Sequence, residues 1–345
     1  MKHFDFCIGN PPYQEDTKNE GDRPNPIYDK FMDAAFEVAD CIELIHPARF
    51  LFNAGQTSKA WNEKMLHDEH FKVLSYEPDA ANVFPSTDIK GGVAITLRDN
   101  SQTFGSIGTF TSHTELNSIV KKVVQYSKEA QYLDTFISSR GMYRLSSAFY
   151  AKYPYAAEKV GKGSGNMIVS NIFDKLPEAF LITQPTEPGS YIKIYGRTNN
   201  KRTYRYLRSE YVIANDYIDK YKLFFPEANS SGQFGETLTL PDIGYPGEGA
   251  TDTFINIGPL ASLEEATSLL KYIKTKFLRT MLGTKKATQH TPKSVWELVP
   301  LQDFTPASDI DWSKSIPEID RQLYAKYGLT DEEIEFIETH VKEMV

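Results

Sequence analysis

A short apolar segment followed by a stiff loop stands near the start of the chain. Phe4 to Ile8 is mostly apolar and predicts a strand buried on both faces, which Gly9 ends. The next four residues are Asn10-Pro11-Pro12-Tyr13. The two prolines fix φ at about −65° and bias the residue before each away from helix, so this loop has few conformations. The loop therefore presents an amide, a rigid carbonyl group and an aromatic ring in a fixed arrangement.

The position of this loop is that of a ligand-binding segment. In open α/β sheets, ligands bind outside the carboxyl ends of the strands. The alternative is an ordinary turn. From average residue usage, this tetrapeptide should occur by chance in about one chain in a thousand of this size. We therefore interpret Asn10 to Tyr13 as functional residues.

The segment Asp5 to Tyr13 resembles motif IV of the S-adenosylmethionine-dependent amino methyltransferases, above all the enzymes that methylate adenine N6 in DNA. The resemblance implies that Asn10, Pro11, Pro12 and Tyr13 form the catalytic loop. The exocyclic amine of a purine is a poor nucleophile, because its lone pair is delocalised into the ring. If Asn10 Oδ1 and the Pro11 carbonyl each accept one N–H, the lone pair is turned toward the methyl donor, which is catalysis by positioning and by preorganised dipoles. Tyr13 would stack on the base after it is flipped out of the duplex.

Length and composition bound the class of protein. The 345 residues have room for two domains, and 40% hydrophobic with 13% aromatic residues indicates a globular chain. There is no run of 18 apolar residues and no signal peptide at the N-terminus. Two cysteines, Cys7 and Cys41, make neither a disulfide framework nor a zinc site. We expect a cytoplasmic protein without a metal centre.

The net charge of −8 first argues against a nucleic-acid partner. The charge is unevenly distributed, however. Residues 301–345 carry eleven acids and four bases, net −7, so the rest of the chain is close to neutral at −1. Local basic clusters can therefore face DNA while the acidic C-terminal tail stays away from it.

The first hundred residues predict alternating strands and helices. Tyr28 to Ala39 has an apolar face at helical spacing after a start signal at Asn25-Pro26, and a second helix is predicted over Ser58 to His67. The remaining predicted strands are Ile42–His46, Phe71–Tyr76 and Val93–Leu97. The resemblance identifies this order as the C-terminal half of a Rossmann-like methyltransferase sheet. It also implies an aromatic residue that backs the flipped base, for which Phe84 is the candidate, and a core role for Phe84 is the alternative.

The glycine-rich cofactor motif that should precede this half is not found. Three glycine clusters occur, at 104–108, 160–165 and 246–249, but none follows an apolar strand and opens a helix. The residues that bind the cofactor are therefore unknown. The first strand would show an unpaired edge, which we expect to be covered by a partner polypeptide carrying the cofactor-binding half or by another copy of the same chain. We favour the partner polypeptide.

A basic hairpin is predicted in the second part of the chain. Strand Tyr191 to Gly196 leads into Arg197 to Arg208, where cations are interleaved with Asn and Tyr, a composition that suits phosphate contacts and base-edge readout. A solvated hairpin without a nucleic-acid role is the alternative. A long helix is predicted from the capping box at Ser262 through about Leu282, with two lysines following it. The candidate DNA contacts are Arg197, Asn199, Asn200, Lys201, Arg202, Tyr204, Arg205, Arg208, Lys285 and Lys286.

The resemblance extends diffusely along the chain, because residues 251–300 resemble the target-recognition region of type IIG restriction-modification enzymes. It implies three domains: a partial methyltransferase domain over 1–115, an α+β target-recognition domain over 116–300 and an acidic helical tail over 301–345. The implied function is methyl transfer from S-adenosylmethionine to adenine N6 in a specific double-stranded DNA sequence. The alternatives are a non-catalytic DNA-binding specificity subunit and a glutamine-N5 protein methyltransferase, which shares Asn-Pro-Pro-Tyr but usually ends with its sheet.

Overall fold

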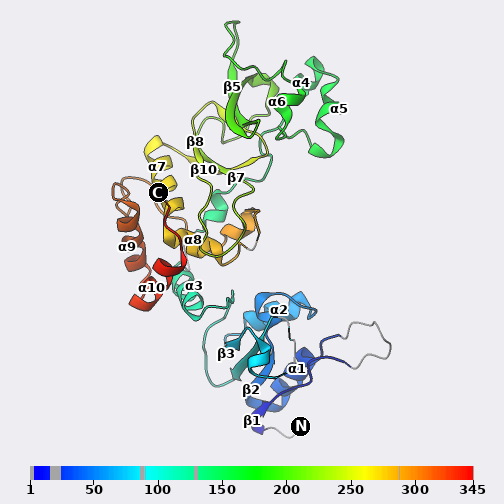
Figure 1. The fold of residues 1–345 in the computed structure, drawn as a ribbon, viewed down its shortest axis with the longest axis vertical. Coiled ribbons are helices and arrows are strands. Elements are labelled where there is room, and N and C mark those ends of the chain that lie inside the picture. The colour runs from blue at the N-terminus through cyan, green and yellow to red at the C-terminus, as the bar shows by residue number, and fades with distance from the viewer. Residues whose placement is uncertain are drawn as a thin grey trace. The chain divides into compact units, whose positions relative to one another are not determined.

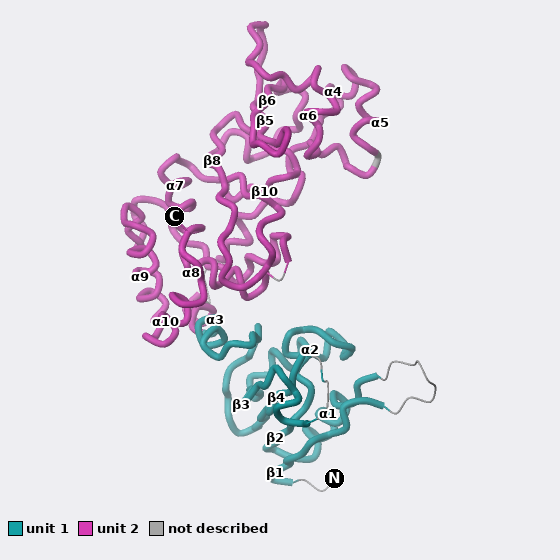
Figure 2. The backbone as a smooth tube through the Cα atoms, in the orientation of Figure 1, with its two compact units in different colours: residues 1–121 teal, residues 122–345 magenta. Residues whose placement is uncertain are grey.

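The structure is a computed structural model that describes residues 4–15, 25–85, 89, 91–127, 131–286 and 288–344. The chain divides into two compact units, residues 1–121 and 122–345 (Figure 2). Both units combine helices and strands, so the mixed α/β class predicted from the sequence is confirmed. Among the described residues, no helix is both long and apolar enough to span a membrane.

Unit 1 is built on one four-stranded sheet with the order β1-β2-β4-β3 (Figure 1). β1 and β2 are parallel, and β4 runs antiparallel to β2 and β3. The elements are β1 (Phe4–Gly9), α1 (Tyr28–Val38), β2 (Ala39–Pro47), the short helix η1 (Arg49–Phe52), α2 (Lys59–Leu66), β3 (Phe71–Glu77), η2 (Ala80–Asn82), β4 (Val93–Asp99) and α3 (Thr114–Tyr126), which ends in unit 2.

Local signals account for most of these boundaries. The Ser58 side chain accepts from the Trp61 amide at 3.2 Å and so begins α2 where the sequence predicts it. The predicted start of the first helix is two residues early, because Pro26 forms a β-bridge with Gln14 and the helix begins at Tyr28 without a side-chain cap. The core of unit 1 lies beneath the sheet, around Met32, Phe50, Met65 and Phe71.

The prediction that the first strand is buried on both faces is wrong in this structure. β1 pairs only with β2, so it is the edge of the sheet. Cys7 packs against the core, but on the other face Phe6 is 72% exposed and Ile8 is 80% exposed. The reason is tertiary: no described element of unit 1 covers that face of β1.

Unit 2 contains two three-stranded sheets with the orders β10-β7-β8 and β6-β5-β9. The strands are β5 (Tyr191–Thr198), β6 (Lys201–Arg208), β7 (Tyr221–Pro226), β8 (Asp242–Gly244), β9 (Glu248–Ala250) and β10 (Phe254–Leu260). The helices are η3 (Leu133–Phe136), α4 (Ser147–Lys152), α5 (Ala156–Val160), η4 (Lys162–Ser164), α6 (Ile172–Lys175), η5 (Ser209–Tyr211), α7 (Leu263–Lys274), α8 (Lys276–Gly283), η6 (Lys293–Trp296), α9 (Ile316–Lys326) and α10 (Asp331–His340).

The predicted long helix from residue 263 to about 282 is two helices, α7 and α8. Thr275 has an extended conformation between them, and its Oγ1 accepts from the Leu278 amide at 3.1 Å. The Asp320 carboxylate, which comes from α9, accepts from the amides of Lys276 and Phe277 at 3.0 and 2.9 Å. The periodic apolar pattern continues across the break, so only the tertiary contact with α9 reveals it.

The C-terminal helices belong to the body of unit 2. α9 packs against α7 and α8, and α10 packs against α8. Lys122 Nζ lies 2.7 Å from Glu333 Oε2 and adds an ion pair between α3 and α10. The functional boundaries predicted at residues 115 and 300 stay predictions, since the compact units describe contacts and not roles.

Candidate active site

The loop Asn10 to Tyr13 lies at the carboxyl end of β1 and lines a pocket of unit 1. Because β1 and β2 are parallel, the segments that follow both strands meet at the same edge of the sheet. The pocket has a volume of about 850 Å³, within the range of ligand sites. Its described lining residues are Asn10, Pro11, Pro12, Tyr13, Gln14, Pro26, Tyr28, Pro47, Arg49, Gly55, Gln56, Phe84 and Ile89.

Tyr13 and Phe84 come together in this pocket although 71 residues separate them in the sequence. Their ring centroids are 6.2 Å apart and the rings are edge-to-face at 69°. Burial raises the pKa of Tyr13, and the Asn10 side chain offsets this in part. Among the described residues, no group forms a hydrogen bond of normal geometry with the buried Tyr13 hydroxyl. The structure thus brings Phe84 to the predicted loop, while its role as a base-stacking residue stays a prediction.

A buried histidine, His46, lies behind one wall of the pocket. His46 Nε2 lies 2.7 Å from Thr96 Oγ1 and its Nδ1 lies 3.1 Å from the Pro47 carbonyl. Burial lowers the pKa of His46 to about 4, and the hydrogen bond to Pro47 offsets this only in part. The neutral ring therefore donates from Nδ1 and accepts from Thr96. Tyr28 stacks parallel to it at 6.0 Å, so His46 fixes a wall of the pocket without entering it.

Two further polar residues of the pocket, Arg49 and Gln56, were not predicted from the sequence. Both follow β2 and are exposed. The available signal was their place after the second parallel strand of the sheet, where its carboxyl end meets that of β1.

The described residues of unit 1 do not form a cradle that fits S-adenosylmethionine. The glycine clusters at 104–108, 160–165 and 246–249 do not open an α-helix after a strand in the structure. No carboxylate lines the described part of the pocket that could hold the hydroxyl groups of a ribose. The described lining of the pocket is thus uncharged except for Arg49.

The basic hairpin predicted in the second part of the chain is formed by β5 and β6. Asn199 and Asn200 make the two-residue turn with φ of 50° and 60°, which asparagine tolerates well and which the twist of a hairpin favours. The tip extends from the body of unit 2 (Figure 1). Beside it, an open hollow of about 420 Å³ is lined by Asn171, Asp174, Arg197, Asn199 and Asn200, with Ser170 and Thr253.

The cations of this hairpin fall into two groups. Arg197 and Lys201 at the tip are exposed, and neither forms an ion pair within the described part of the chain. The others are held by the protein: Arg202 pairs with Asp242 and donates to the Leu240 carbonyl at 2.9 Å, while Arg208 lies 3.3 Å from Glu187.

The remaining side chains of β6 are also engaged. Arg205 donates to Thr203 Oγ1 at 2.9 Å and lies over the ring of Phe173 at 5.4 Å. The Tyr204 hydroxyl donates to Glu248 at 3.2 Å. Free positive charge is therefore concentrated at the tip of the hairpin.

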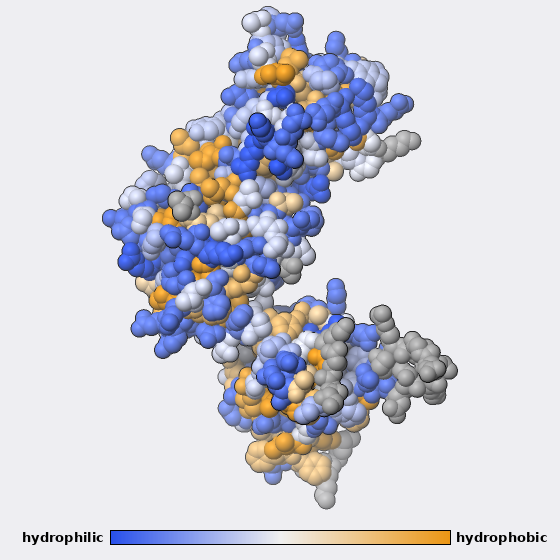
Figure 3. All heavy atoms as spheres, in the orientation of Figure 1, coloured by the Kyte–Doolittle hydropathy of each residue, from blue (hydrophilic) through white to orange (hydrophobic). Residues whose placement is uncertain are grey.

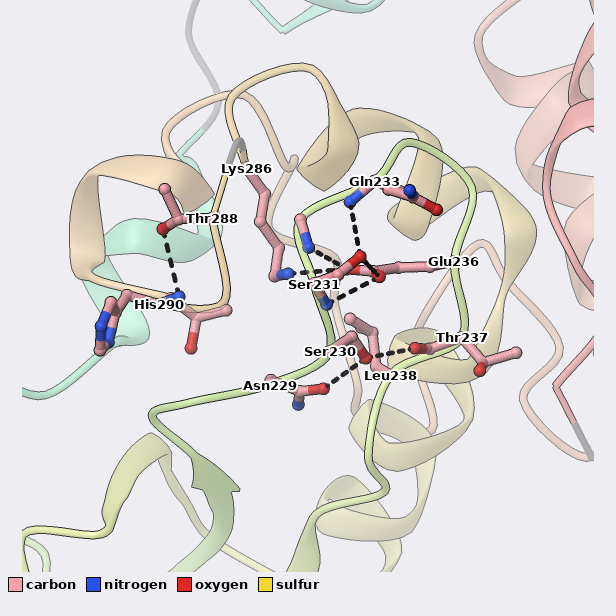
Figure 4. A network of polar contacts seen from close by, with 12 residues as sticks. Asn229, Ser230, Ser231, Gln233, Glu236, Thr237, Leu238, Lys286, Thr288 and His290 are labelled. Carbon is pink, nitrogen blue, oxygen red and sulfur yellow. Dashed lines mark hydrogen bonds and ion pairs between the residues drawn. The ribbon is translucent and has the colours of Figure 1, made fainter.

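The predicted contact Lys286 has a structural role in this conformation. Its ammonium group is buried 2.9 Å from Glu236 (Figure 4). Glu236 also accepts from the amides of Ser231 and Gly232 at 2.9 and 2.7 Å. Burial would raise the pKa of Glu236, but the ion pair and these hydrogen bonds lower it to about 2. Lys286 thus fixes the loop after β7, whereas Lys285 is partly exposed and 2.6 Å from Glu297.

The comparisons with known proteins concern mainly the N-terminal part of the chain. Residues 1–84 match the family model of the Eco57I restriction-modification methylases. An uncharacterized adenine-specific methylase of Mycoplasma pneumoniae (strain ATCC 29342 / M129 / Subtype 1) is 27% identical over 101 residues, which are 28% of this chain and 24% of that protein. The predicted resemblance to adenine-specific methyltransferases of restriction-modification systems is thereby confirmed.

The chain spans about a quarter of the length of this curated relative. Among solved structures, the type IIG restriction endonuclease BpuSI is similar over 92% of this chain and 49% of its own. The sequence identity is 11% and the TM-score is 0.31, which is too low to support an argument about fold or function.

Proposed function

We propose that this protein takes part in methylating adenine N6 in a specific DNA sequence, within a restriction-modification system. The observation that carries the proposal is the loop Asn10 to Tyr13, which lines a pocket at the carboxyl end of β1 together with Phe84. The similarity of residues 1–84 to restriction-modification methylases supports it. S-adenosylmethionine, when bound, supplies an electrophilic methyl group.

In this proposal, the loop binds and orients the amine of the base. Asn10 Oδ1 and the Pro11 carbonyl each accept one N–H, so the nitrogen lone pair leaves the plane of the ring. Tyr13 and Phe84 hold the flipped base through contacts with its π-face. None of the described lining residues is a carboxylate or a histidine, which favours positioning over general-base catalysis.

The tip of the β5–β6 hairpin is proposed as a DNA contact. Arg197 and Lys201 are exposed and suit phosphate oxygens, while the Asn199 and Asn200 amides suit base edges. An Asn side chain matches the donor and acceptor that adenine shows in the major groove. The strand cations Arg202, Arg205 and Arg208 hold the hairpin in shape.

The exposed face of β1 is proposed as the contact with the cofactor-binding half. Phe4, Phe6 and Ile8 form a continuous apolar row beside an unpaired strand edge, and Figure 3 shows apolar atoms at this end of unit 1. Apolar edges of this kind are covered in native assemblies. The proposed occupant is a parallel sheet segment with a glycine-rich loop, on a partner polypeptide.

The test is to purify the full chain together with the polypeptides that bind it, and to incubate the material with S-adenosylmethionine labelled on the methyl group and unmethylated DNA. We expect label in N6-methyladenine, detected after digestion of the DNA to nucleosides. Label in protein glutamine would instead favour the glutamine-N5 alternative. Specific DNA binding without any transfer, with the cofactor-binding partner present, would favour a non-catalytic specificity subunit.

A further inference from the structure

Arg49 stands at the rim of the pocket that contains the Asn10–Tyr13 loop. It is the first residue of η1 and follows β2 directly after Pro47 and Ala48. Since β1 and β2 are parallel, the chain that leaves β2 is brought beside the chain that leaves β1. Arg49 thus faces the same cavity as Asn10 and Tyr13.

Within the described part of the chain, the Arg49 guanidinium has no polar partner. It forms no hydrogen bond or ion pair with any residue that the structure describes. Arg98, the other described arginine of unit 1, is by contrast paired with Asp68 at 2.7 Å. Arg49 is close enough to Tyr28 to lower the pKa of that phenol, against the larger effect of burial. Among the described residues, the charge of Arg49 at the pocket is therefore unpaired.

Two glycines hold the stem of Arg49. Gly55 and Gly91 have φ of +99° and +90°, which side chains other than glycine rarely adopt. A Cβ atom at Gly91 would lie 2.5 Å from Arg49 Cγ, and one at Gly55 would lie 3.3 Å from Arg49 Cβ. Packing between these glycines restricts the stem, so less side-chain entropy is lost when the guanidinium binds an anion.

We infer that Arg49 binds a phosphate of the nucleotide whose base lies against Tyr13 and Phe84. The inference rests on the proposed function and adds the part of the substrate that lies outside the aromatic site. A guanidinium is a planar fork that matches phosphate oxygens with two hydrogen bonds. An anion site beside an aromatic site fits a nucleotide, whose base is neutral and whose phosphodiester carries the charge. It gives no advantage to a neutral glutamine side chain.

The experiment compares deoxyadenosine with its 5′- and 3′-monophosphates as ligands of the full chain, with affinities measured by NMR titration. The wild-type protein should bind one of the nucleotides about tenfold more tightly than the nucleoside. Arg49→Ala should bind all three compounds with the weak affinity of the nucleoside, and Arg49→Lys should retain part of the preference. Lys59→Ala removes an exposed cation of unit 1 outside the pocket and should leave every affinity unchanged.

The outcomes separate this inference from the proposed function. Asn10→Ala should weaken the binding of the nucleoside and of the nucleotides by the same factor, so the ratio of their affinities is unchanged. Equal binding of nucleoside and nucleotides by the wild type overturns the role of Arg49 but not the adenine site. Failure to bind any adenine compound overturns both. S-adenosylmethionine is titrated in parallel. If Arg49→Ala weakens the binding of S-adenosylmethionine instead, the guanidinium binds the cofactor carboxylate, and the inference is also overturned.

Discussion

Asn10 and Tyr13 differ in how far the rest of the protein buries their side chains. Asn10 is exposed on the loop, where its amide can meet a ligand. Tyr13 is half-buried and its hydroxyl lies out of contact with solvent, with Phe84 against its ring. Its packing therefore shapes the pocket as well as offering a surface to a base.

We predict that Asn10→Ala abolishes methyl transfer while the fold and the affinity for duplex DNA are retained. Loss of one preorganised polar group typically costs about 10²–10³ in rate. The measurement is single-turnover methylation in the presence of the cofactor-binding partner, with circular dichroism as the control for folding. Unchanged turnover would refute the assignment of the loop.

Tyr13→Ala should lower the rate of transfer by about 5- to 150-fold, through loss of a stack that contributes about 1–3 kcal/mol. Tyr13→Phe is the matched control, because it keeps the ring and removes only the hydroxyl. It should retain most of the activity. Equal loss in both variants would show that the hydroxyl and not the ring matters.

At the scale of elements, the β5–β6 hairpin shows how one basic segment serves two purposes. Its strand cations bind neighbouring carboxylates and carbonyls, while the two cations at its tip form no ion pair with any described residue. Gly196 marks the base of the tip, because a Cβ atom there would lie 2.5 Å from the Phe173 ring. The hairpin can therefore pack tightly up to Gly196 and project beyond it.

We expect Lys201→Gln to flatten the salt dependence of DNA binding by about one unit of slope, as removal of one phosphate contact does. Arg202→Gln is the matched variant one residue away. It should change the slope less and lower the stability, since Asp242 loses its ion pair and keeps only the hydrogen bond from the Tyr195 hydroxyl. Fluorescence anisotropy at several salt concentrations measures the slope. Equal slopes for wild type and Lys201→Gln would place the tip outside the interface.

The low pKa of Glu236 predicts that the stability of unit 2 depends on pH. This pKa is about 2 in the folded protein against 4.5 ordinarily, so the unfolded chain binds the proton more readily. The stabilisation, at most about 3 kcal/mol, is present above pH 4.5 and is lost as the pH falls toward 2. Glu236→Gln should therefore be destabilised at pH 7 and should approach the wild type near pH 3.

Urea unfolding of unit 2 at both pH values measures this difference. Glu297→Gln is the control, because its ion pair with Lys285 is solvent-exposed and should contribute less than about 1 kcal/mol. If the free energies of unfolding of the wild type and Glu236→Gln differ by the same amount at pH 7 and pH 3, the effect is one of packing and not of charge.

At the scale of the molecule, the apolar face of β1 is not covered by any described element of unit 1. Phe6 and Ile8 are more exposed than any other large apolar residue except Ile182 among the described residues. Each buried side chain of this size contributes about 1.5–3 kcal/mol, so covering the row would stabilise a complex substantially.

We predict that the purified chain alone neither binds S-adenosylmethionine tightly nor methylates DNA. Light scattering, cofactor titration and a transfer assay test this directly. Phe6→Ser with Ile8→Ser should leave the fold intact, because both side chains are exposed, and should abolish association with the cofactor-binding partner. Phe31→Ser, at a 47% exposed residue of α1, is the control. A stable monomer that methylates DNA would refute the prediction.

The sequence by itself determined the loop at Asn10 to Tyr13, the order of strands and helices in the first hundred residues, and the hairpin with its Asn-Asn turn. These features depend on local rules: proline conformation, apolar periodicity and turn chemistry. The tertiary structure decided the rest. It brought Phe84 and Arg49 to the loop, paired Lys286 with Glu236, divided one long apolar pattern into α7 and α8 through Asp320, and left β1 at a sheet edge. Contacts between residues distant in sequence leave no local pattern, because they depend on which faces the packed elements turn toward each other.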